Sequence, residues 1–278
     1  MLALPFPQID PVAFAVGPVE VKWYGLSYMA GLLLGWLYIR NLIAQTRFWP
    51  HTAAPFAPVK ADDLLIYITI GVMLGGRLGF ILFYEPRHYL SNPLEIAMIW
   101  QGGMAFHGAL LGCGLAIYIF SVRNHCNPLS AMDACAAAVP IGLFFGRLAN
   151  FINGELWGRP TTIPWGMVFP EAQRSYPDIE PVLRHPSQLY EAALEGLALF
   201  LLLRLLTHRY GALQSPGLVT GMFLLGYGVA RSFCELFRQF DPGHAFSNYG
   251  FTPGIVYSIP MVLLGLWFIR SAQTRTTV

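Results

Sequence analysis

Long apolar runs alternate with short polar segments along nearly the whole chain. A helix needs about 20 apolar residues to cross the hydrocarbon core of a bilayer, and runs of that length recur here. Read against their polar flanks, these runs predict seven helices. Their ranges are 24–44, 63–84, 105–122, 129–151, 188–206, 217–237 and 252–270. The expected fold class is therefore an all-α polytopic integral membrane protein.

One connection differs from the others, the segment 152–187, which contains PTTIPWGMVFPEAQRSYPDIEPVLRHP. It is too polar to span a membrane and longer than an ordinary connector between helices. The chain shows no internal repeat and no low-complexity tract. We therefore expect a single transmembrane domain over residues 1–278, with 152–187 as a loop or arm within it.

Composition agrees with this class. Of the 278 residues, 55% are hydrophobic and only 12% are charged, whereas a soluble domain has about 25% charged residues. The mean hydropathy is +0.51. A net charge of +2 without a basic block gives no indication of nucleic-acid binding. The N-terminal MLALPFPQIDPVAF has no positively charged start and contains three prolines, so it is not expected to be a cleavable signal peptide.

The four cysteines do not have the pattern of a disulfide framework or a zinc site. Three lie within apolar runs and one in a short loop, with no pair at metal-ligand spacing, and we expect them to be small buried side chains. They are Cys113, Cys126, Cys135 and Cys234.

Lysine and arginine positions predict the orientation in the membrane. If the N-terminus defines one face, the opposite face receives eight basic residues: Arg40, Arg47, Lys60, Arg123, Arg204, Arg209, Arg270 and Arg275. The N-terminal face receives six: Lys22, Arg87, Arg159, Arg174, Arg184 and Arg238. Three of these six lie in the long loop, where charge counts less. The N-terminus and the 152–187 loop are therefore expected outside, and the C-terminus in the cytoplasm.

Polar residues within the predicted helices gather at their outer ends. Charged side chains inside a membrane are costly and are functional candidates by default, and residues that share one depth indicate a shared site. The set comprises Tyr24, Arg77, His107, Arg147, Asn150, Glu191, Arg231 and Glu235.

Spacing supports a common pocket. Arg147, Asn150 and Gly154 share one helical face if the helix continues that far. Arg231 and Glu235, four residues apart, are placed to form an ion pair. Glycine pairs at 75–76 and 102–103 allow close backbone approach or a helix break.

Structural roles compete with these functional ones. Arg77 is as well suited to snorkelling toward headgroups as to a site. Tyr24, next to Trp23, fits an interfacial aromatic, and His107 alone fits a hydrogen-bonded structural histidine. Glu191 and Glu195 fit helix-packing partners for nearby arginines.

Arg147 and Arg231 are the hardest to explain as structure. Two cations aimed at one pocket, with only some acidic partners nearby, indicate an anion, and in a membrane the available anion is a lipid phosphate. A histidine suits a general base. The sequence contains no Ser-His-Asp elbow, HExxH or Walker loop.

A transporter or channel is the competing class. It predicts polar residues at both depths or at the midplane, often in duplicated halves, but the stretches LALFLLLRLL and SIPMVLLGLW are almost wholly apolar. A purely structural scaffold leaves the clustered arginines unexplained.

The stretch GRLANFINGELWGR resembles the signature of the prolipoprotein diacylglyceryl transferases, which reads Gly-Arg-x-(Gly or Ala)-Asn-Phe-apolar-Asn-x-Glu-x-x-Gly. Its fixed positions are filled by Gly146, Arg147, Ala149, Asn150, Phe151, Asn153, Glu155 and Gly158. WYGLSY, GGRLGF, GGMAFHGALLG, HPSQLYEA and YGVARSFCELFRQFD also resemble the family, in order.

This resemblance implies an activity in the bacterial inner (cytoplasmic) membrane. The family transfers a diacylglyceryl group from phosphatidylglycerol to the lipobox cysteine of a prolipoprotein signal peptide, forms a thioether and releases glycerol phosphate, without metal or cofactor. By resemblance, Arg147 and Arg231 engage the phosphate and His107 is the candidate base. The residues expected to shape or brace the site are Tyr24, Asn150, Asn153, Gly154, Glu155 and Glu235.

Overall fold

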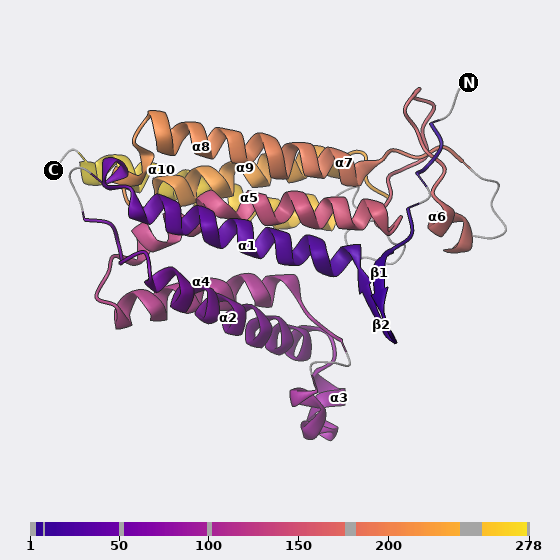
Figure 1. The fold of residues 1–278 in the computed structure, drawn as a ribbon, viewed down its shortest axis with the longest axis horizontal. Coiled ribbons are helices and arrows are strands. Elements are labelled where there is room, and N and C mark those ends of the chain that lie inside the picture. Colours follow the sequence, from indigo (N-terminus) through magenta and orange to yellow (C-terminus); the bar gives the residue numbers. More distant parts are fainter. Residues whose placement is uncertain are drawn as a thin grey trace.

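Long helices run side by side along one axis in the computed structural model (Figure 1). The structure describes residues 4–7, 9–49, 53–98, 102–175, 182–239 and 252–276. The long helices are α1 (Trp23–Ala44), α2 (Lys60–Phe83), α4 (Phe106–Arg123), α5 (Pro128–Ile152), α9 (Leu218–Glu235) and α10 (Pro253–Thr276). A further helical stretch joins α7 (Ser187–Glu191), the π-helical segment η4 (Ala192–Ala198) and α8 (Leu199–Arg209) without a break. Each predicted helical range coincides with one of these.

Membrane character follows from length and composition. Among the described residues, four helices are long and apolar enough to cross a bilayer: Trp23–Ala44, Lys60–Phe83, Pro128–Ile152 and Gly254–Gln273. A shorter apolar helix covers Gly108–Arg123. The protein is therefore a predominantly helical membrane protein, and the crossing by all seven segments stays a prediction.

Several short elements were not predicted. Strands β1 (Val12–Val16) and β2 (Val19–Lys22) form an antiparallel hairpin, so the expectation of purely helical structure was incomplete. Alternating valines favour strands, and Gly17, with a φ of 60°, provides the turn between them. Short helical pieces also occupy predicted connections: η1 (Thr46–Phe48), α3 (Pro86–Ser91), η2 (Pro93–Ala97), α6 (Pro170–Ser175) and η5 (Ala212–Gln214).

Glycines spaced four apart bring α2 and α4 into backbone contact. A Cβ placed on Gly112 would lie 2.0 Å from the carbonyl oxygen of Gly71, and one on Gly75 would lie 2.3 Å from that of Gly108. Such small-residue faces allow membrane helices to approach closely, so that backbone atoms replace side chains in the interface. The two helices therefore form a tight pair beside α1 and α5 (Figure 1).

The start of α9 is held by a buried carboxylate. Asp133 of α5 is fully buried and accepts hydrogen bonds from the backbone N–H groups of Gly217 and Thr220, at 2.7 and 2.8 Å. The Thr220 hydroxyl also donates to it, at 2.7 Å. These N–H groups belong to the unpaired first turn of α9, so Asp133 sets where the helix starts.

Arg77 is a structural cation. Its side chain is buried, and its guanidinium donates to the carbonyls of Glu95 and Ile96, at 2.5 and 3.0 Å. It also donates to the carbonyls of Gly102 and Gly103, which have φ values of 86° and 78°. Positive φ, which glycine adopts readily, belongs to the conformation that turns these carbonyls inward. Snorkelling toward headgroups is therefore the wrong interpretation.

The described parts of the 152–187 segment fold over the end of the bundle where α1 begins and α5 ends (Figure 1). Isolated β-bridges pair Gly158 with Arg238 and Pro160 with Arg184. The aromatic rings of Phe6, Phe151 and Phe169 form a small separate core there. This segment is packed against the end of the helices that carry the polar residues.

Candidate functional site

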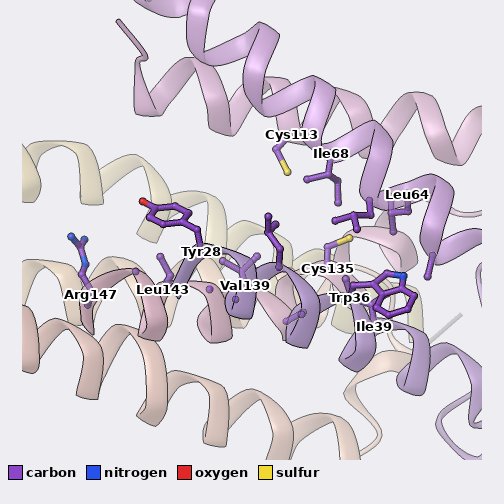
Figure 2. A pocket seen from close by; sticks show the side chains of 18 of the residues that line it. Tyr28, Trp36, Ile39, Leu64, Ile68, Cys113, Cys135, Val139, Leu143 and Arg147 are labelled. Atoms are coloured by element: carbon purple, nitrogen blue, oxygen red, sulfur yellow. The ribbon is translucent and has the colours of Figure 1, made fainter. Parts of the chain in front are cut away.

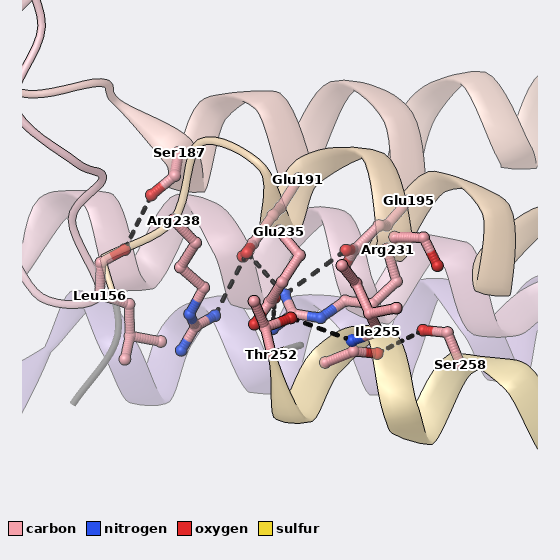
Figure 3. Close-up of polar contacts among 12 residues, drawn as sticks. Leu156, Ser187, Glu191, Glu195, Arg231, Glu235, Arg238, Thr252, Ile255 and Ser258 are labelled. Atoms are coloured by element: carbon pink, nitrogen blue, oxygen red, sulfur yellow. Dashed lines mark hydrogen bonds and ion pairs between the residues drawn. The ribbon is translucent and has the colours of Figure 1, made fainter. Parts of the chain in front are cut away.

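Charged side chains from three parts of the chain meet at this end of the bundle (Figure 3). Helix α5 contributes one arginine, α7 and η4 contribute two glutamates, and α9 with the residues after it contributes two arginines and a glutamate. The members of this cluster, called the arginine–glutamate network below, are Arg147, Glu191, Glu195, Arg231, Glu235 and Arg238.

Glu191 lies at the centre of the network. Its Oε2 is 2.9 Å from Nε of Arg147, and its Oε1 is 2.7 Å from Nη1 of Arg231 and 3.2 Å from Nη1 of Arg238. The Glu191 side chain is 0% exposed. A single buried carboxylate therefore holds three guanidinium groups together, as is required for ions that have lost their hydration.

The other two glutamates differ in how tightly they are held. Glu235 lies 2.6 Å from Nη2 of Arg231, which confirms the ion pair predicted from their spacing. Glu195 is farther from its partners, 3.4 Å from Nη2 of Arg147 and 3.7 Å from Nη1 of Arg231. Glu191 and Glu195 are thus helix-packing partners for the arginines, one of the two roles considered for them.

The network has a buried side and a more exposed side. The three glutamate side chains are at most 4% exposed, whereas those of Arg147, Arg231 and Arg238 are 18%, 14% and 20% exposed. The expectation of only some acidic partners near Arg147 and Arg231 underestimated them, because each arginine of the network contacts a glutamate. Each guanidinium has five N–H donors, however, so the arginines retain donors on their more exposed side.

An apolar cavity of about 470 Å³ ends at this network (Figure 2). It lies between α1, α2, α4 and α5, with Arg147 and Asn150 among its lining residues. Figure 2 shows Tyr28 and Arg147 toward one end and Trp36 and Ile39 toward the other. A long apolar space with a cation at one end is complementary to an amphipathic anion.

The GRLANFINGELWGR stretch forms the end of α5 and the turn that follows it. The helix ends at Ile152, and Gly154 follows with a φ of 67°, so the helix does not continue far enough for Gly154 to share the face of Arg147. Asn150 and Asn153 both donate to Oε1 of Glu155, at 2.8 and 3.4 Å. The amides and the carboxylate of this stretch are therefore bonded to one another next to the cavity.

Tyr24 lies beside this turn. It is the second residue of α1, its hydroxyl donates to that of Tyr28 at 3.1 Å, and it is within electrostatic range of Glu155 and Arg147. His107 is the second residue of α4, at the same end of the bundle, but its side chain lies outside the described residues.

A histidine, His185, lies just outside the network. Nδ1 of His185 is 3.2 Å from the Tyr190 hydroxyl, which accepts a hydrogen bond from Nε1 of Trp165 at 2.8 Å. Burial lowers the pKa of His185 below its ordinary value, because a charged imidazole loses hydration there. This shift favours the neutral form of His185.

Sequence reasoning missed two contributors. Arg238 was placed in a loop, although it lies seven residues after Arg231, a spacing that shares a helical face. Nothing in the sequence pattern around Gly254 indicated a role in the site. A Cβ on this residue would lie 2.4 Å from Cδ of Glu235, so α10 supports the ion pair through the absence of a side chain.

Together, the fold and the site define a helical membrane protein with a buried arginine–glutamate network at the end of an apolar cavity. The family model described as prolipoprotein diacylglyceryl transferase matches residues 11–270, and the chain belongs to this family.

Curated relatives agree over nearly the full length. A phosphatidylglycerol--prolipoprotein diacylglyceryl transferase of Rhizobium meliloti (strain 1021) is 51% identical over 98% of this chain and 95% of its own. Proteins of the same name from Rhizobium leguminosarum bv. trifolii and Methylocella silvestris are 48% and 49% identical, covering 99% and 98% of this chain and 96% and 97% of their own.

Proposed function

We propose that this protein transfers the diacylglyceryl group of phosphatidylglycerol to the lipobox cysteine thiol of prolipoproteins. The products are a thioether-linked lipid and glycerol phosphate, and the reaction is the first step of bacterial lipoprotein maturation. The observation that carries the proposal is the apolar cavity ending at Arg147, beside the arginine–glutamate network. Membership of the transferase family supports it.

Lipid binding divides between the two parts of the site. Acyl chains occupy the apolar cavity, where their burial is favourable. The phosphate binds the more exposed sides of Arg147 and Arg231, whose planar guanidiniums match its oxygens. Glu191 and Glu235 hold these guanidiniums from the buried side, so that little ordering is needed when the phosphate arrives.

The chemical step is a substitution at carbon. A base takes up the thiol proton, and the thiolate sulfur attacks the carbon of the diacylglyceryl group that bears the phosphate oxygen. The carbon–oxygen bond breaks, and its electron pair leaves with glycerol phosphate. Arg147 and Arg231 stabilise the negative charge that develops on the leaving group. His107, at the start of α4, is the proposed base.

The remaining site residues shape the headgroup end. Asn150, Asn153 and Glu155 form a hydrogen-bonded turn, and Asn150 also lines the cavity. Tyr24 lies beside that turn, and Gly154 supplies its left-handed backbone. Glu235 braces Arg231.

We also propose the arrangement in the membrane. The seven helical segments each cross the bacterial inner membrane as one domain over residues 1–278, with the N-terminus periplasmic and the C-terminus cytoplasmic. The 152–187 loop is periplasmic and lies over the site, where it meets the signal peptide of the prolipoprotein substrate. Four sufficiently long apolar helices support this arrangement, as does the excess of basic residues on the opposite face.

The test is a transfer assay with labelled phosphatidylglycerol, a lipobox peptide and purified protein. Arg147→Ala and Arg231→Ala are each expected to lower transfer about a hundredfold or more, because each removes a group that stabilises leaving-group charge. Arg209→Ala, an exposed arginine at the other end of the bundle, is the control and should retain transfer. Near-normal transfer by both site variants would refute the phosphate-binding role.

Two additions sharpen the assay. His107→Gln is expected to abolish transfer, and full activity of this variant across neutral pH would remove His107 as the base. A control peptide carries serine in place of the lipobox cysteine and should receive no label. Label on the cysteine peptide alone separates lipid transfer from lipid transport.

A further inference from the structure

The arginine–glutamate network is formally neutral before any lipid binds. It contains three guanidiniums and three carboxylates, with the carboxylates on the buried side. An arriving phosphate diester adds a negative charge to a region of low dielectric. Uncompensated charge there is costly, so the cluster is expected to recover neutrality by binding a proton.

Glu195 is the carboxylate least well held by its partners. Its distances to Arg147 and Arg231 are 3.4 and 3.7 Å, against 2.6–3.2 Å for Glu191 and Glu235. Its Oε1 is buried and has no hydrogen-bond partner among the described residues, which also holds for Oε2 of Glu191 and of Glu235, so the longer ion-pair distances are what distinguish Glu195. It is also 0% exposed and lies one turn from Glu191, a second negative charge.

Phosphate binding weakens the hold on Glu195 further. Arg147 and Arg231 are the cations that both Glu195 and the phosphate contact under the proposed function. Negative charge on their outer side reduces the favourable potential that they provide at Glu195. Arg147 and Arg231 hold Glu191 and Glu235 at shorter distances, 2.6–2.9 Å, so we expect the change to fall mainly on Glu195.

We propose that the protein takes up one proton when it binds phosphatidylglycerol and that Glu195 holds this proton. This inference rests on the proposed function. The proton comes from water at the outer face, and no covalent bond changes. A protonated Glu195 gains an O–H donor that its ionised form lacks. Glu195 is buried and does not touch the substrate, so it is a positioning residue that keeps the network neutral around the bound lipid.

Other titratable groups face the same position. From α9, Tyr227 and Cys234 lie within electrostatic range of Glu195, together with Arg231. Arg147 faces it from α5 and Glu191 from α7. Tyr227 and Cys234 are neutral in ordinary conditions, and the arginines stay charged, so the exchangeable proton belongs to the glutamates.

The experiment is calorimetry of phosphatidylglycerol binding to the detergent-solubilised full chain without peptide. Two buffers of different ionisation enthalpy report the number of protons taken up. For the unmodified protein we expect uptake of about one proton per bound lipid. In the pH range where a full proton is taken up, the affinity should fall about tenfold for each unit by which the pH rises. Glu195→Gln mimics the protonated side chain, so it should bind without proton uptake and with little pH dependence.

Controls isolate the site and the ligand. Glu20→Gln, an exposed carboxylate on β2, should leave proton uptake unchanged. Diacylglycerol, which lacks the phosphate, should cause no uptake. An infrared difference spectrum of the unmodified protein should show a protonated carboxyl band with phosphatidylglycerol, so the proposal stays testable even if Glu195→Gln does not fold.

Absence of proton uptake by the unmodified protein, or unchanged uptake by Glu195→Gln, would overturn this inference. Transfer activity distinguishes its failure from that of the function. An unmodified protein that transfers lipid to the peptide but takes up no proton contradicts only the role of Glu195. One that transfers no lipid contradicts the proposed function itself.

Discussion

Arg77 and Glu191 stabilise buried charge in two different ways. Arg77 donates to backbone carbonyls, among them those of Glu95 and Ile96. Glu191 instead contacts three guanidiniums. The first arrangement orders a loop, whereas the second leaves donors on cations, of which Arg147 lines the cavity. The chemistry of a buried charge therefore depends on its partners, and only the second arrangement suits an anionic ligand.

Gly254→Ala tests how closely the network depends on its surroundings. The new Cβ would lie 2.4 Å from Cδ of Glu235, so this carboxylate must move away from Arg231. We expect transfer to fall about tenfold or more, equivalent to ~1.4 kcal/mol in transition-state stabilisation. Steady-state transfer assays check this, with Gly114→Ala as a control of equal size. Equal activity of the two variants would contradict the expectation.

At the scale of elements, glycine faces decide which helices pair. The α2 and α4 backbones touch through Gly71, Gly75, Gly108 and Gly112, and α9 meets α10 through Gly221, where a Cβ would lie 2.9 Å from a carbonyl oxygen of α10. Membrane helices gain little from apolar burial against one another, because lipid is equally apolar. Close backbone packing is therefore a source of specific association for these two helix pairs.

Gly112→Ala and Gly114→Ala form a matched pair on α4. At Gly112 the added methyl group would lie 2.0 Å from the Gly71 carbonyl oxygen, whereas at Gly114 nothing lies within 4 Å. We expect Gly112→Ala to cost about 1–3 kcal/mol of stability through overpacking. Gly114→Ala should be neutral or stabilising by up to about 1 kcal/mol, because alanine favours helix. Thermal unfolding in detergent measures both, and equal destabilisation would contradict this packing.

At the scale of the whole molecule, orientation determines which solvent the site meets. The arginine–glutamate network lies at the end of the bundle that carries the 152–187 segment, opposite the end of the C-terminal helix α10 (Figure 1). If this end is periplasmic, the site faces the side on which the signal-peptide cysteine of an exported protein becomes accessible. Topology and proposed substrate are thus consistent.

Cysteine labelling tests this orientation in a Cys126→Ser background. Arg174→Cys, on an exposed side chain of α6, should react with a membrane-impermeant maleimide in intact spheroplasts. Arg209→Cys, exposed at the end of α8, should react only after permeabilisation. The reverse pattern would show that the proposed orientation is wrong.

Local pattern was sufficient for the helices and for contacts within one helix. The apolar runs predicted every long helix, with ends within about three residues except that α10 continues to Thr276, and four-residue spacing predicted the Arg231–Glu235 pair. The carbonyl partners of Arg77 and the end of α5 before Gly154 were beyond that pattern. These depend on how a loop folds back or where a helix stops, and neither leaves a periodic signal.

The sequence by itself determined the helical membrane class, the family signature and the depth at which polar residues gather, because each depends on local composition and spacing. Only the tertiary structure decided that Arg147 and Glu191 pair across 44 positions of the chain, and that a neutral network rather than an excess of cations adjoins the cavity. Charge compensation depends on distances in space between helices, and hydrophobic periodicity contains no information about which helices meet.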